Sequence, residues 1–517
     1  MSEITRAIAE LPLRFKGPGG AVAVIKDGAV IAREAWGYAD LARYRPFTPA
    51  TLFPICSISK QFTCALLLDQ LGDPARLDAA LKARLPALAE PAPRVLHLCH
   101  NQSGLRDYWA LTVLCGAAPE GAFRPADATS LMGRTRTLHF PPGTQYSYSN
   151  GNFRLLSDVL EDHLGKPFDE MLKARILTPA GMATARLNPE TGNLPGGAVG
   201  YEGDDAFGFI PAVNHIHWTG DAGMVATLDD MIAWERFIDA TYGDESSLYR
   251  RLSVRPHFAD GRPASYGFGL AHMESQGIVV TGHGGALRGW RSQRLHVAQE
   301  RLSVVVLFNH ESSAREAAFA VLRAALGQAT PPRPETAYDP QWTGAWHEPR
   351  SGLVLDIAPA NGTKGQLSAR FTTDAEMLAL KSENEAASPS MTLRRDGDTI
   401  RMLRPVDNLD AELTRLSGPS PADVTGSFQC GELDSLFQVT ATGNATYASF
   451  EGFLGKGAMQ PLYPIAGDIW RLPCRRSMDA PAPGDWTVHF HRDAAGKISG
   501  VTVGSWLARR VAFETRK

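Results

Sequence analysis

The pattern of the sequence changes at a proline-rich stretch, and this change limits the folds that the chain can adopt. The stretch is Gly327-Gln-Ala-Thr-Pro-Pro-Arg-Pro-Glu-Thr-Ala337, whose composition favours an extended spacer. Before it, strand-like segments occur together with helical repeats. After it, only short strand-like segments and turns follow. Because 517 residues are too many for one hydrophobic core, we expect several domains.

The first region has the pattern of an α+β domain. Residues 20–25 and 29–36 flank the turn Lys26-Asp27-Gly28 and predict an opening hairpin. Residues 301–308 predict a buried strand, which a last helix follows around residues 314–326. An antiparallel sheet made from both ends of this region, with helices in between, predicts an α+β domain. We expect this domain to span residues 1–330 and a linker to span residues 331–340.

The remainder of the chain contains two similar halves, separated by Ser417-Gly-Pro-Ser-Pro421. Each half has a glycine and an aromatic residue before a strand-like run, and later a charged hairpin turn. These features are Gly344-Ala-Trp346 with Arg395-Asp-Gly-Asp398, and Gly426-Ser-Phe428 with Arg492-Asp-Ala-Ala-Gly496. We therefore expect two all-β domains, residues 341–417 and 418–517. Small antiparallel barrels are the expected form, because closure removes exposed strand edges.

Ser57-Ile-Ser-Lys60 places a hydroxyl and an amine one helical turn apart. Residues 61–72 repeat apolar side chains at helical spacing and end at a glycine, so Ser57 lies at a predicted helix N-terminus. Free backbone N–H groups favour negative charge there, and Lys60 points its amine towards the serine. Such a pair can make a serine attack a carbonyl. A capping serine followed by a solvated lysine has the same sequence, and is the alternative interpretation.

Two further motifs follow, in the order found in serine enzymes that have a Ser-x-x-Lys motif. Tyr148-Ser-Asn150 lies in a turn-rich loop before a predicted helix over residues 152–165. A buried tyrosine beside a capping asparagine is the alternative there. His283-Gly-Gly285 ends a strand-like run, and its glycines indicate that another backbone or a substrate approaches closely. His163-Leu-Gly165 closes the predicted helix as a cap, so context favours His283.

Together the three motifs resemble those of the penicillin-recognising serine hydrolases, a family that includes class C β-lactamases, D,D-carboxypeptidases, esterases and D-aminopeptidases. The resemblance covers about residues 18–328. Most members have Lys-Thr-Gly as the third motif, whereas His283-Gly-Gly285 is similar to the D-stereospecific aminopeptidases. Similarity to that subgroup extends through the C-terminal segments, which are residues 450–456, 476–481 and 506–509. The resemblance implies eight strands in each barrel, and a dimer.

The resemblance also implies a role for the residues of the first two motifs. Ser57 would attack the carbonyl of a peptide or amide and form an acyl-enzyme that water later hydrolyses. Lys60 would take the proton if burial or a nearby cation lowered its pKa from about 10.4. Alternatively, a charged Lys60 would depress the pKa of Tyr148, and a phenolate would take the proton. Asn150 would orient either the substrate amide or Lys60.

The third motif would supply the remaining groups at the reacting carbonyl. His283 would polarise the hydrogen-bond network and help Tyr148 to protonate the leaving group. The N–H of Ser57 and, by family position, that of Ala286 would form the oxyanion hole.

An aminopeptidase must also recognise a free α-ammonium group, for which a carboxylate in a closed site is suited. The resemblance assigns this contact to Asp479, in a proline-stiffened loop over residues 475–485 of the last domain. An Asx turn before a proline would explain Asp479 without a function. The residues of this expected specificity loop are Arg476, Ser477, Met478, Asp479, Ala480, Pro481 and Gly484.

Charge and composition exclude several classes of partner. The net charge of −3 gives no basic field for nucleic acid or an anionic membrane, and no run is long and apolar enough for a membrane helix. The N-terminus has no apolar signal core, and the six cysteines lack disulfide-scaffold spacing, so we expect a cytoplasmic protein. His97, Cys99 and His100 have ligand chemistry, but in a predicted loop they are expected to pack. We expect no metal and no cofactor.

The sequence thus predicts a cytoplasmic serine D-aminopeptidase that removes N-terminal D-residues, preferably D-alanine, from short peptides, amides and esters. Its partners would be these small substrates, with β-lactams as inhibitors. One alternative is an esterase or β-lactamase-like hydrolase, because the same serine, lysine and tyrosine serve esters and β-lactams. Another is an inactive penicillin-binding-like sensor with barrels as interaction modules. The intact Lys60 and Tyr148 argue against a sensor.

Overall fold

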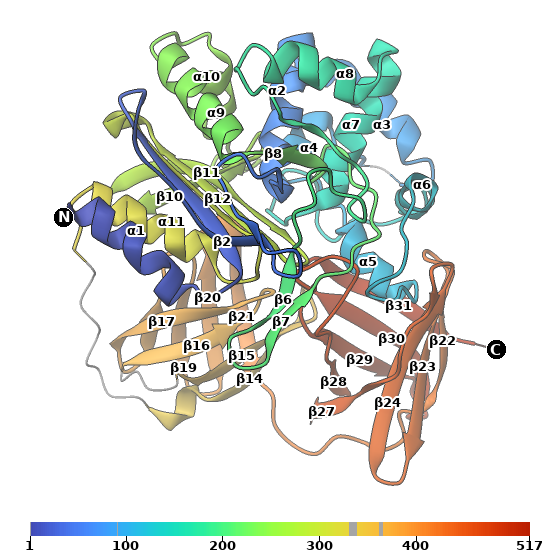
Figure 1. Cartoon of the computed structure of the whole chain (residues 1–517). Coiled ribbons are helices and arrows are strands. Elements are labelled where there is room, and N and C mark those ends of the chain that lie inside the picture. Colours follow the sequence, from blue (N-terminus) through green and yellow to red (C-terminus); the bar gives the residue numbers. More distant parts are fainter. Residues whose placement is uncertain (1, 90, 330–338, 361–364, 517) are drawn as a thin grey trace.

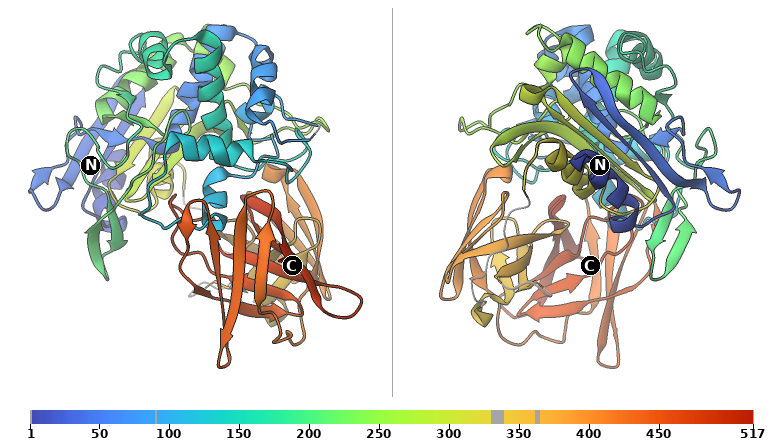
Figure 2. Two further views of the ribbon diagram at one scale, coloured as in Figure 1. Left: turned by 90° about the vertical axis from the view of Figure 1, so that its right-hand side faces the viewer. Right: turned by 60° about the vertical axis from the view of Figure 1, so that its left-hand side comes forward.

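The computed structural model describes residues 2–89, 91–329, 339–360 and 365–516. An N-terminal part of mixed helices and strands is followed by two all-β units that lie side by side against it (Figures 1 and 2). Most of the predicted linker, at positions 331–338, lies outside the described residues. The predicted fold class, an α+β domain before two antiparallel all-β units, is confirmed.

An antiparallel eight-stranded sheet forms the centre of the N-terminal part. In spatial order its strands are β3 (Arg45–Pro46), β2 (Ala29–Asp40), β1 (Gly19–Lys26), β13 (Leu302–Phe308), β12 (Trp290–Val297), β11 (Ile278–Leu287), β10 (Leu270–Ser275) and β9 (Tyr266–Gly267). The predicted opening hairpin is β1–β2, and β13 pairs with β1, with Gly20 opposite Phe308. The two ends of this part therefore meet in the middle of the sheet, as expected.

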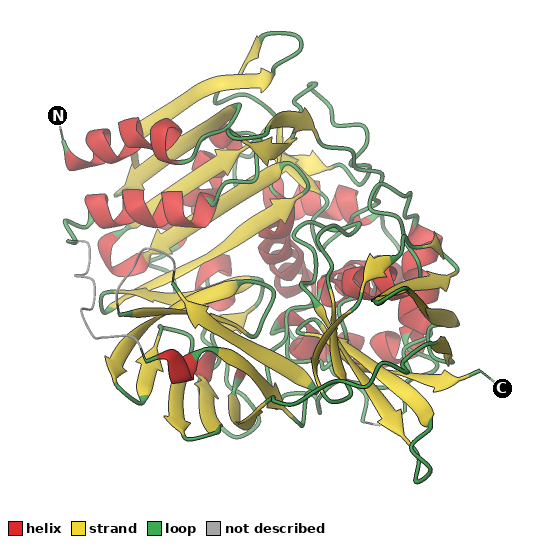
Figure 3. Cartoon of the chain, turned by 90° about the horizontal axis from the view of Figure 1, so that it is seen from below, coloured by secondary structure: helices red, strands yellow, loops and turns green. Residues whose placement is uncertain are grey.

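Both faces of the sheet are covered, so β1 has buried apolar residues on both of its sides. Ala21 and Ala23 point into the core that surrounds the inner helices, whereas Val22 and Val24 point into a second core. The second core lies under α1 (Glu3–Arg14) and α11 (Ala314–Ala325), which run side by side on the outer face (Figure 3).

The inner face is covered by the remaining helices of the N-terminal part. These are α2 (Ser59–Leu71), α3 (Asp78–Arg84), α4 (Val95–Cys99), α5 (Tyr108–Leu114), α6 (Pro125–Gly133), α7 (Asn150–Leu164), α8 (Phe168–Leu172), α9 (Leu228–Thr241) and α10 (Leu248–Leu252). Gly165 caps α7 in the left-handed conformation, as predicted. The loop predicted around His97, Cys99 and His100 is wrong, because α4 forms there and buries Val95, Leu98 and Cys99. No helix in the described ranges is long and apolar enough to cross a membrane.

Short elements connect these helices to the sheet. One small antiparallel sheet contains β4 (Phe53–Pro54), β8 (Met224–Ala226) and β5 (Arg186–Leu187), and a separate hairpin contains β6 (Tyr201–Asp204) and β7 (Gly208–Pro211). Single turns of other helix types lie at Cys56–Ile58, Pro74–Leu77, Lys173–Leu177, Ala298–Glu300, Pro340–Trp342 and Pro405–Asp407. Because β4 runs directly into the turn at Cys56–Ile58, its pairing with β8 fixes the approach to α2.

The first all-β unit is a closed barrel of eight antiparallel strands. They are β14 (Gly344–Glu348), β15 (Leu353–Pro359), β16 (Gln366–Arg370), β17 (Ala375–Ser382), β18 (Glu385–Ala387), β19 (Thr392–Asp396), β20 (Thr399–Arg404) and β21 (Leu409–Arg415). The charged turn predicted at Arg395–Asp398 joins β19 to β20. Trp342 and Trp346 fill the barrel core together with inward-facing aliphatic residues.

The second all-β unit is a curled sheet of ten antiparallel strands. They are β22 (Gly426–Cys430), β23 (Ser435–Thr442), β24 (Ala445–Gly452), β25 (Gly455–Lys456), β26 (Gln460–Pro461), β27 (Tyr463–Ala466), β28 (Ile469–Leu472), β29 (Trp486–Arg492), β30 (Ile498–Ser505) and β31 (Ala508–Thr515). The implied count of eight strands is therefore wrong here. The additional strands β25 and β26 both pair with β24, and the β24–β25 turn packs against Gly116 of the N-terminal part.

The turn between β30 and β31 joins all three parts of the molecule. Trp506 enters the core of the first barrel, and the guanidinium of Arg509 lies 3.8 Å from the Trp506 ring. The backbone N–H of Asp107, just before α5, donates to the Leu507 carbonyl at 2.9 Å. The last unit is therefore in direct contact with the interior of the N-terminal part, next to the residues described below.

Candidate active site

Ser57 lies in the single helical turn Cys56–Ile58, directly before α2. Cys56 adopts a positive φ of 54°, and the Ser59 hydroxyl donates to the Cys56 carbonyl at 2.6 Å. The Ser292 hydroxyl of β12 also donates to the Ile55 carbonyl at 3.0 Å. The sheet and α2 therefore hold the backbone on both sides of Ser57, whose own side chain is half-buried.

Gly285 allows β11 to lie against this turn. A Cβ atom at Gly285 would lie 2.5 Å from the Ile55 carbonyl oxygen and 2.9 Å from the Cys56 Cβ, closer than atoms pack. The prediction that a backbone approaches the glycines of the third motif is confirmed. The next residue, Ala286, is thereby brought beside the turn that carries Ser57.

Lys60 is fully buried, and its amine contacts three oxygen atoms. The amine Nζ lies 3.0 Å from Ser57 Oγ, 2.8 Å from Asn150 Oδ1 and 2.7 Å from the Asp221 carbonyl oxygen. The last two oxygens can only accept hydrogen bonds, so they take two N–H groups of Lys60. The third position of the nitrogen faces Ser57 and carries a proton in the ammonium form or a lone pair in the neutral amine.

Asp107 fixes the orientation of the Asn150 side chain. Its carboxylate accepts from the Asn150 backbone N–H at 2.8 Å and from Asn150 Nδ2 at 3.3 Å. Because the amide NH₂ faces Asp107, its oxygen must face Lys60. The structure thus shows Asn150 in contact with Lys60, and both roles expected for its side chain stay predictions.

The surroundings of Lys60 lower its pKa to about 8, because burial disfavours the ammonium form. The carboxylates of Asp221, Asp107 and Asp479 act in the opposite direction and limit this shift. A substantial fraction of Lys60 is therefore neutral near pH 8 and can accept a proton from Ser57.

Tyr148 lies on the other side of the serine hydroxyl, and its phenol donates to Ser57 Oγ at 2.8 Å. Lys60 Nζ lies 4.9 Å from the centre of the Tyr148 ring. Burial raises the pKa of Tyr148 well above its usual value, so the phenol keeps its proton. These opposite pKa shifts favour Lys60 over a Tyr148 phenolate as the base.

His283 is buried on β11 and hydrogen-bonded to Tyr266. Its Nδ1 bonds to the Gly284 carbonyl, and its Nε2 lies 2.9 Å from the Tyr266 hydroxyl. Burial, aided by the charge of Lys60, lowers the pKa of His283 to about 3, so the ring is neutral. A neutral ring that donates from Nδ1 must accept at Nε2, and the Tyr266 O–H is the donor. The His283 and Tyr148 rings are neighbours, with centres 6.2 Å apart.

Asp479 reaches this group from the loop between β28 and β29 in the last unit. Its carboxylate accepts from the Ala480 backbone N–H at 2.9 Å, and its charge acts on Lys60, Cys56 and Tyr148. Burial, with the nearby negative charge of Asp107, raises the pKa of Asp479 to about 8. A carboxylate held in this way gains most from a cation that binds next to it.

Three residues near Lys60 and His283 were not expected from the sequence, namely Asp107, Asp221 and Tyr266. Tyr108 donates to the Asp221 carboxylate at 2.6 Å, which holds the backbone carbonyl that Lys60 contacts. Asp221 lies within residues 18–328, which resemble the family, and this resemblance is the sequence signal that could have indicated it. Within the described part of the chain, no group of histidine, cysteine or acidic side chains could hold a metal ion.

Comparison with known proteins identifies relatives of both regions of the chain. The family model "Beta-lactamase" matches residues 4–329, and the model "D-aminopeptidase, domain B" matches residues 335–514. A D-aminopeptidase of Brucella ovis is 54% identical over 505 residues, which are 98% of this chain and 97% of that protein. The chain belongs to the D-aminopeptidase family. A D-aminopeptidase of Brucella anthropi is 53% identical over 513 residues, covering 99% and 98% of the two chains.

Solved structures show the same fold at lower sequence identity. D-amino acid amidase from Ochrobactrum anthropi SV3, complexed with D-phenylalanine, is 22% identical with a TM-score of 0.52. The match covers 63% of this chain and 99% of the amidase. An octameric penicillin-binding protein homologue from Pyrococcus abyssi has a TM-score of 0.53 at 19% identity, covering 87% of this chain and 98% of its own.

Proposed function

We propose that this family member is a serine D-aminopeptidase that works through an acyl-enzyme on Ser57. The observation that carries the proposal is the position of Ser57 Oγ, which lies 3.0 Å from the Lys60 amine and 2.8 Å from the Tyr148 phenol. Lys60, whose pKa is lowered, and Tyr148, whose pKa is raised, thus both contact the Ser57 hydroxyl. This is the arrangement that a base and an acid require around a nucleophile.

In the first step, neutral Lys60 takes the proton of Ser57 as Oγ attacks the substrate carbonyl. The backbone N–H groups of Ser57 and Ala286 stabilise the oxyanion, each donor contributing about 3 kcal/mol. The C–N bond then breaks, and the leaving amine receives a proton that Tyr148 delivers and Lys60 replaces. In the second step water attacks the ester and loses a proton to Lys60. Lys60 then delivers that proton to Ser57 Oγ as the bond between Oγ and the acyl carbon breaks.

We propose for His283 a narrower role than the one expected, because its ring is neutral and its Nδ1–H is bonded to the Gly284 carbonyl. We propose that it holds Tyr266 and, through packing, keeps the Tyr148 ring in place. The short contact from Nδ1 to Gly284 also fixes the backbone just before the Ala286 donor. His283 therefore supports proton transfer by Tyr148 without donating a proton itself.

Asp479 supplies the aminopeptidase specificity in this proposal. Its carboxylate would pair with the α-ammonium of the substrate, while the loop around it limits the space beyond the first residue. The relatives are named D-aminopeptidases, which supports a D-residue at this position. We propose D-alanine as the preferred residue of short peptides, amides and esters.

A panel of four chromogenic substrates tests the proposal. We expect hydrolysis of D-alanine p-nitroanilide to exceed that of the L-alanine compound by orders of magnitude, and hydrolysis of a cephalosporin to be slow. Turnover of a simple p-nitrophenyl ester without aminopeptidase activity would favour an esterase. Rapid cephalosporin hydrolysis without aminopeptidase activity would favour a β-lactamase, and binding without turnover of any compound would favour a sensor.

We also propose that the protein is a cytoplasmic homodimer inhibited by β-lactams that acylate Ser57. All six cysteines are free, and five are buried, which suits a reducing compartment. Tyr44 and Phe207 are 80% and 91% exposed, and such aromatic side chains are available for association. Light scattering in solution tests the dimer, and cell fractionation tests the location.

A further inference from the structure

The loop that carries Asp479 belongs to the last unit, but residues of the two other parts hold it. Ser477 and Met478 are 3% and 2% exposed, and Met478 lies in a continuous hydrophobic core that the N-terminal part shares with the last unit. Asp479 follows directly and is half-buried. The position of its carboxylate therefore depends on how this loop is fixed against the N-terminal part.

Arg288 makes the central contact to the loop. It occupies the turn between β11 and β12, two positions after Ala286, and its side chain is 1% exposed. Its Nη2 donates to the Ser477 carbonyl, and also to the Pro119 carbonyl at 3.2 Å. The contact lies two residues before Asp479, so it fixes the backbone just before the carboxylate.

Glu202 on β6 holds the guanidinium in this orientation. Its Oε1 accepts from Arg288 Nη1 at 3.0 Å, and its Oε2 accepts from Arg476 Nη2 at 2.9 Å. Arg476 also contacts Glu120 at 3.0 Å, so the start of the loop is attached to the N-terminal part by two carboxylates. A planar guanidinium can bind a carboxylate and two carbonyls together, which an amine cannot do in the same geometry.

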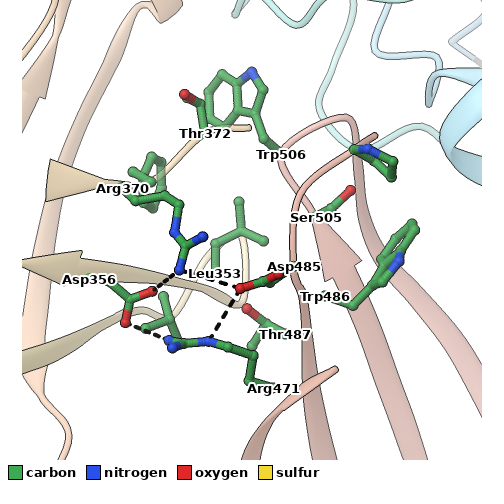
Figure 4. Close-up of a pocket in the computed structure, with 13 residues that line it drawn as sticks. Leu353, Asp356, Arg370, Thr372, Arg471, Asp485, Trp486, Thr487, Ser505 and Trp506 are labelled. Carbon is green, nitrogen blue, oxygen red and sulfur yellow. Dashed lines mark hydrogen bonds and ion pairs between the residues drawn. The ribbon is translucent and has the colours of Figure 1, made fainter. Parts of the chain in front are cut away.

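The other end of the loop is attached to the first barrel (Figure 4). Asp485 lies 3.3 Å from Arg370 of β16, and Arg471 of β28 also approaches Asp485 and pairs with Asp356 of β15. A Cβ atom at Gly484 would lie 3.4 Å from the Thr373 Cα. Both ends of the loop are thus fixed from outside its own unit, and Asp479 lies between them.

The β11–β12 hairpin therefore connects the proposed oxyanion hole with the proposed ammonium subsite. Ala286, on β11, would contribute to the oxyanion hole, and Arg288, in the turn that follows, holds the loop of the ammonium subsite. We infer that Arg288, oriented by Glu202, is a positioning residue that sets the distance between the Asp479 carboxylate and the carbonyl attacked by Ser57. This inference rests on the proposed function, because it assumes that Asp479 binds the ammonium group.

Two variants of this pair and one control test the inference. Arg288→Lys keeps the charge but removes the planar fork, and Glu202→Gln removes the charge that orients it. Arg291→Lys is the control, because Arg291 is the second residue of β12 and contacts the Leu287 and Trp290 carbonyls and Glu311; among the described residues, its hydrogen bonds and ion pairs do not reach the loop. Circular dichroism and thermal melting verify that each variant is folded.

The first readout is hydrogen exchange of the peptide that contains residues 476–484, measured by mass spectrometry. We expect faster exchange in Arg288→Lys and Glu202→Gln than in the wild type and the control. Unchanged exchange in both folded variants would overturn the inference, whatever Asp479 does.

The second readout compares kcat/KM for D-alanine p-nitroanilide with that for propionic acid p-nitroanilide, which lacks the ammonium group. We expect the ratio of the two to fall roughly tenfold in Arg288→Lys, mainly through KM, and to stay constant in Arg291→Lys. In an Asp479→Asn background, the Arg288 change should have little further effect on the ratio. A ratio that falls in Asp479→Asn but not in either positioning variant overturns the inference. A ratio that does not fall in Asp479→Asn instead refutes ammonium binding by Asp479, and with it the role of Arg288 in specificity.

Discussion

The recognition of the substrate ammonium by Asp479 leads to a quantitative prediction for Asp479→Asn. The substitution keeps the shape of the side chain and its bond to the Ala480 N–H, but removes the negative charge. A hydrogen bond between charged groups contributes about 1.5–3 kcal/mol. We therefore expect kcat/KM for D-alanine p-nitroanilide to fall roughly 10- to 100-fold. Propionic acid p-nitroanilide has no ammonium group and should not suffer this loss.

The raised pKa of Asp479 adds a pH dependence to this prediction. The pair forms from an ionised carboxylate, with a pKa of about 8, and a protonated amine, with a pKa of about 7.7–8.0. Below pH 8 the carboxyl group must lose a proton on binding, and above pH 8 the amine must gain one. The ratio of kcat/KM for the two anilides should therefore peak near pH 8, and decline about threefold one pH unit to either side.

The assay is a pH series of this ratio from pH 6 to pH 10, for wild type and Asp479→Asn. Titration of Lys60 affects both substrates and cancels in the ratio. We expect a peak in the wild type and a low, flat ratio in the variant. A wild-type ratio without a maximum, or an equal loss on both substrates in Asp479→Asn, would show that this carboxylate does not bind the ammonium.

Other predictions concern the reacting groups. Lys60→Ala and Tyr148→Phe should each remove most of kcat, and the double variant should lose far less than the sum; additive losses would mean that the two do not act on one proton. For the propionyl substrate, kcat/KM should rise with pH through about 8 as Lys60 loses its proton, and Asp479→Asn should move this rise to lower pH because the carboxylate raises the pKa of Lys60. If the pH of this rise is unchanged in Asp479→Asn, the charge of Asp479 does not act on Lys60. Gly285→Ala should abolish activity in a folded protein, because its Cβ would displace the turn that carries Ser57; wild-type turnover would contradict the close contact.

Local features of the sequence predicted much of the catalytic group. Ser57 and Lys60 are three residues apart on one helical turn, so their contact depends little on the rest of the fold. The close approach at Gly285 was also predictable, because a glycine within a strand often marks a place where another backbone or a ligand comes close. The roles of Ser57, Lys60 and Tyr148 stay predictions until the variants are measured.

Contacts between distant segments could not be predicted in the same way. The Asp221 carbonyl is 161 positions from Lys60, and Ser477 is 189 positions from Arg288. Nothing local distinguishes such residues, because only the packed fold brings them together. Short elements were also uncertain: α4 formed in a segment expected to be a loop, because tertiary burial of Leu98 and Cys99 outweighed its weak local signals. The additional strand β25 similarly lies where Gly455 meets Gly116 of the N-terminal part.

Direct detection of the acyl-enzyme tests the central proposal most directly. The protein is mixed with a D-alanine p-nitrophenyl ester, whose good leaving group makes deacylation the slower step, and the mixture is quenched with acid. Intact mass and peptide mapping then locate any adduct. We predict a single D-alanyl group on the peptide that contains Ser57, none with the L-alanine ester, and none in Ser57→Ala. Continued turnover by Ser57→Ala, or an adduct on another residue, would contradict the assignment of Ser57 as the nucleophile.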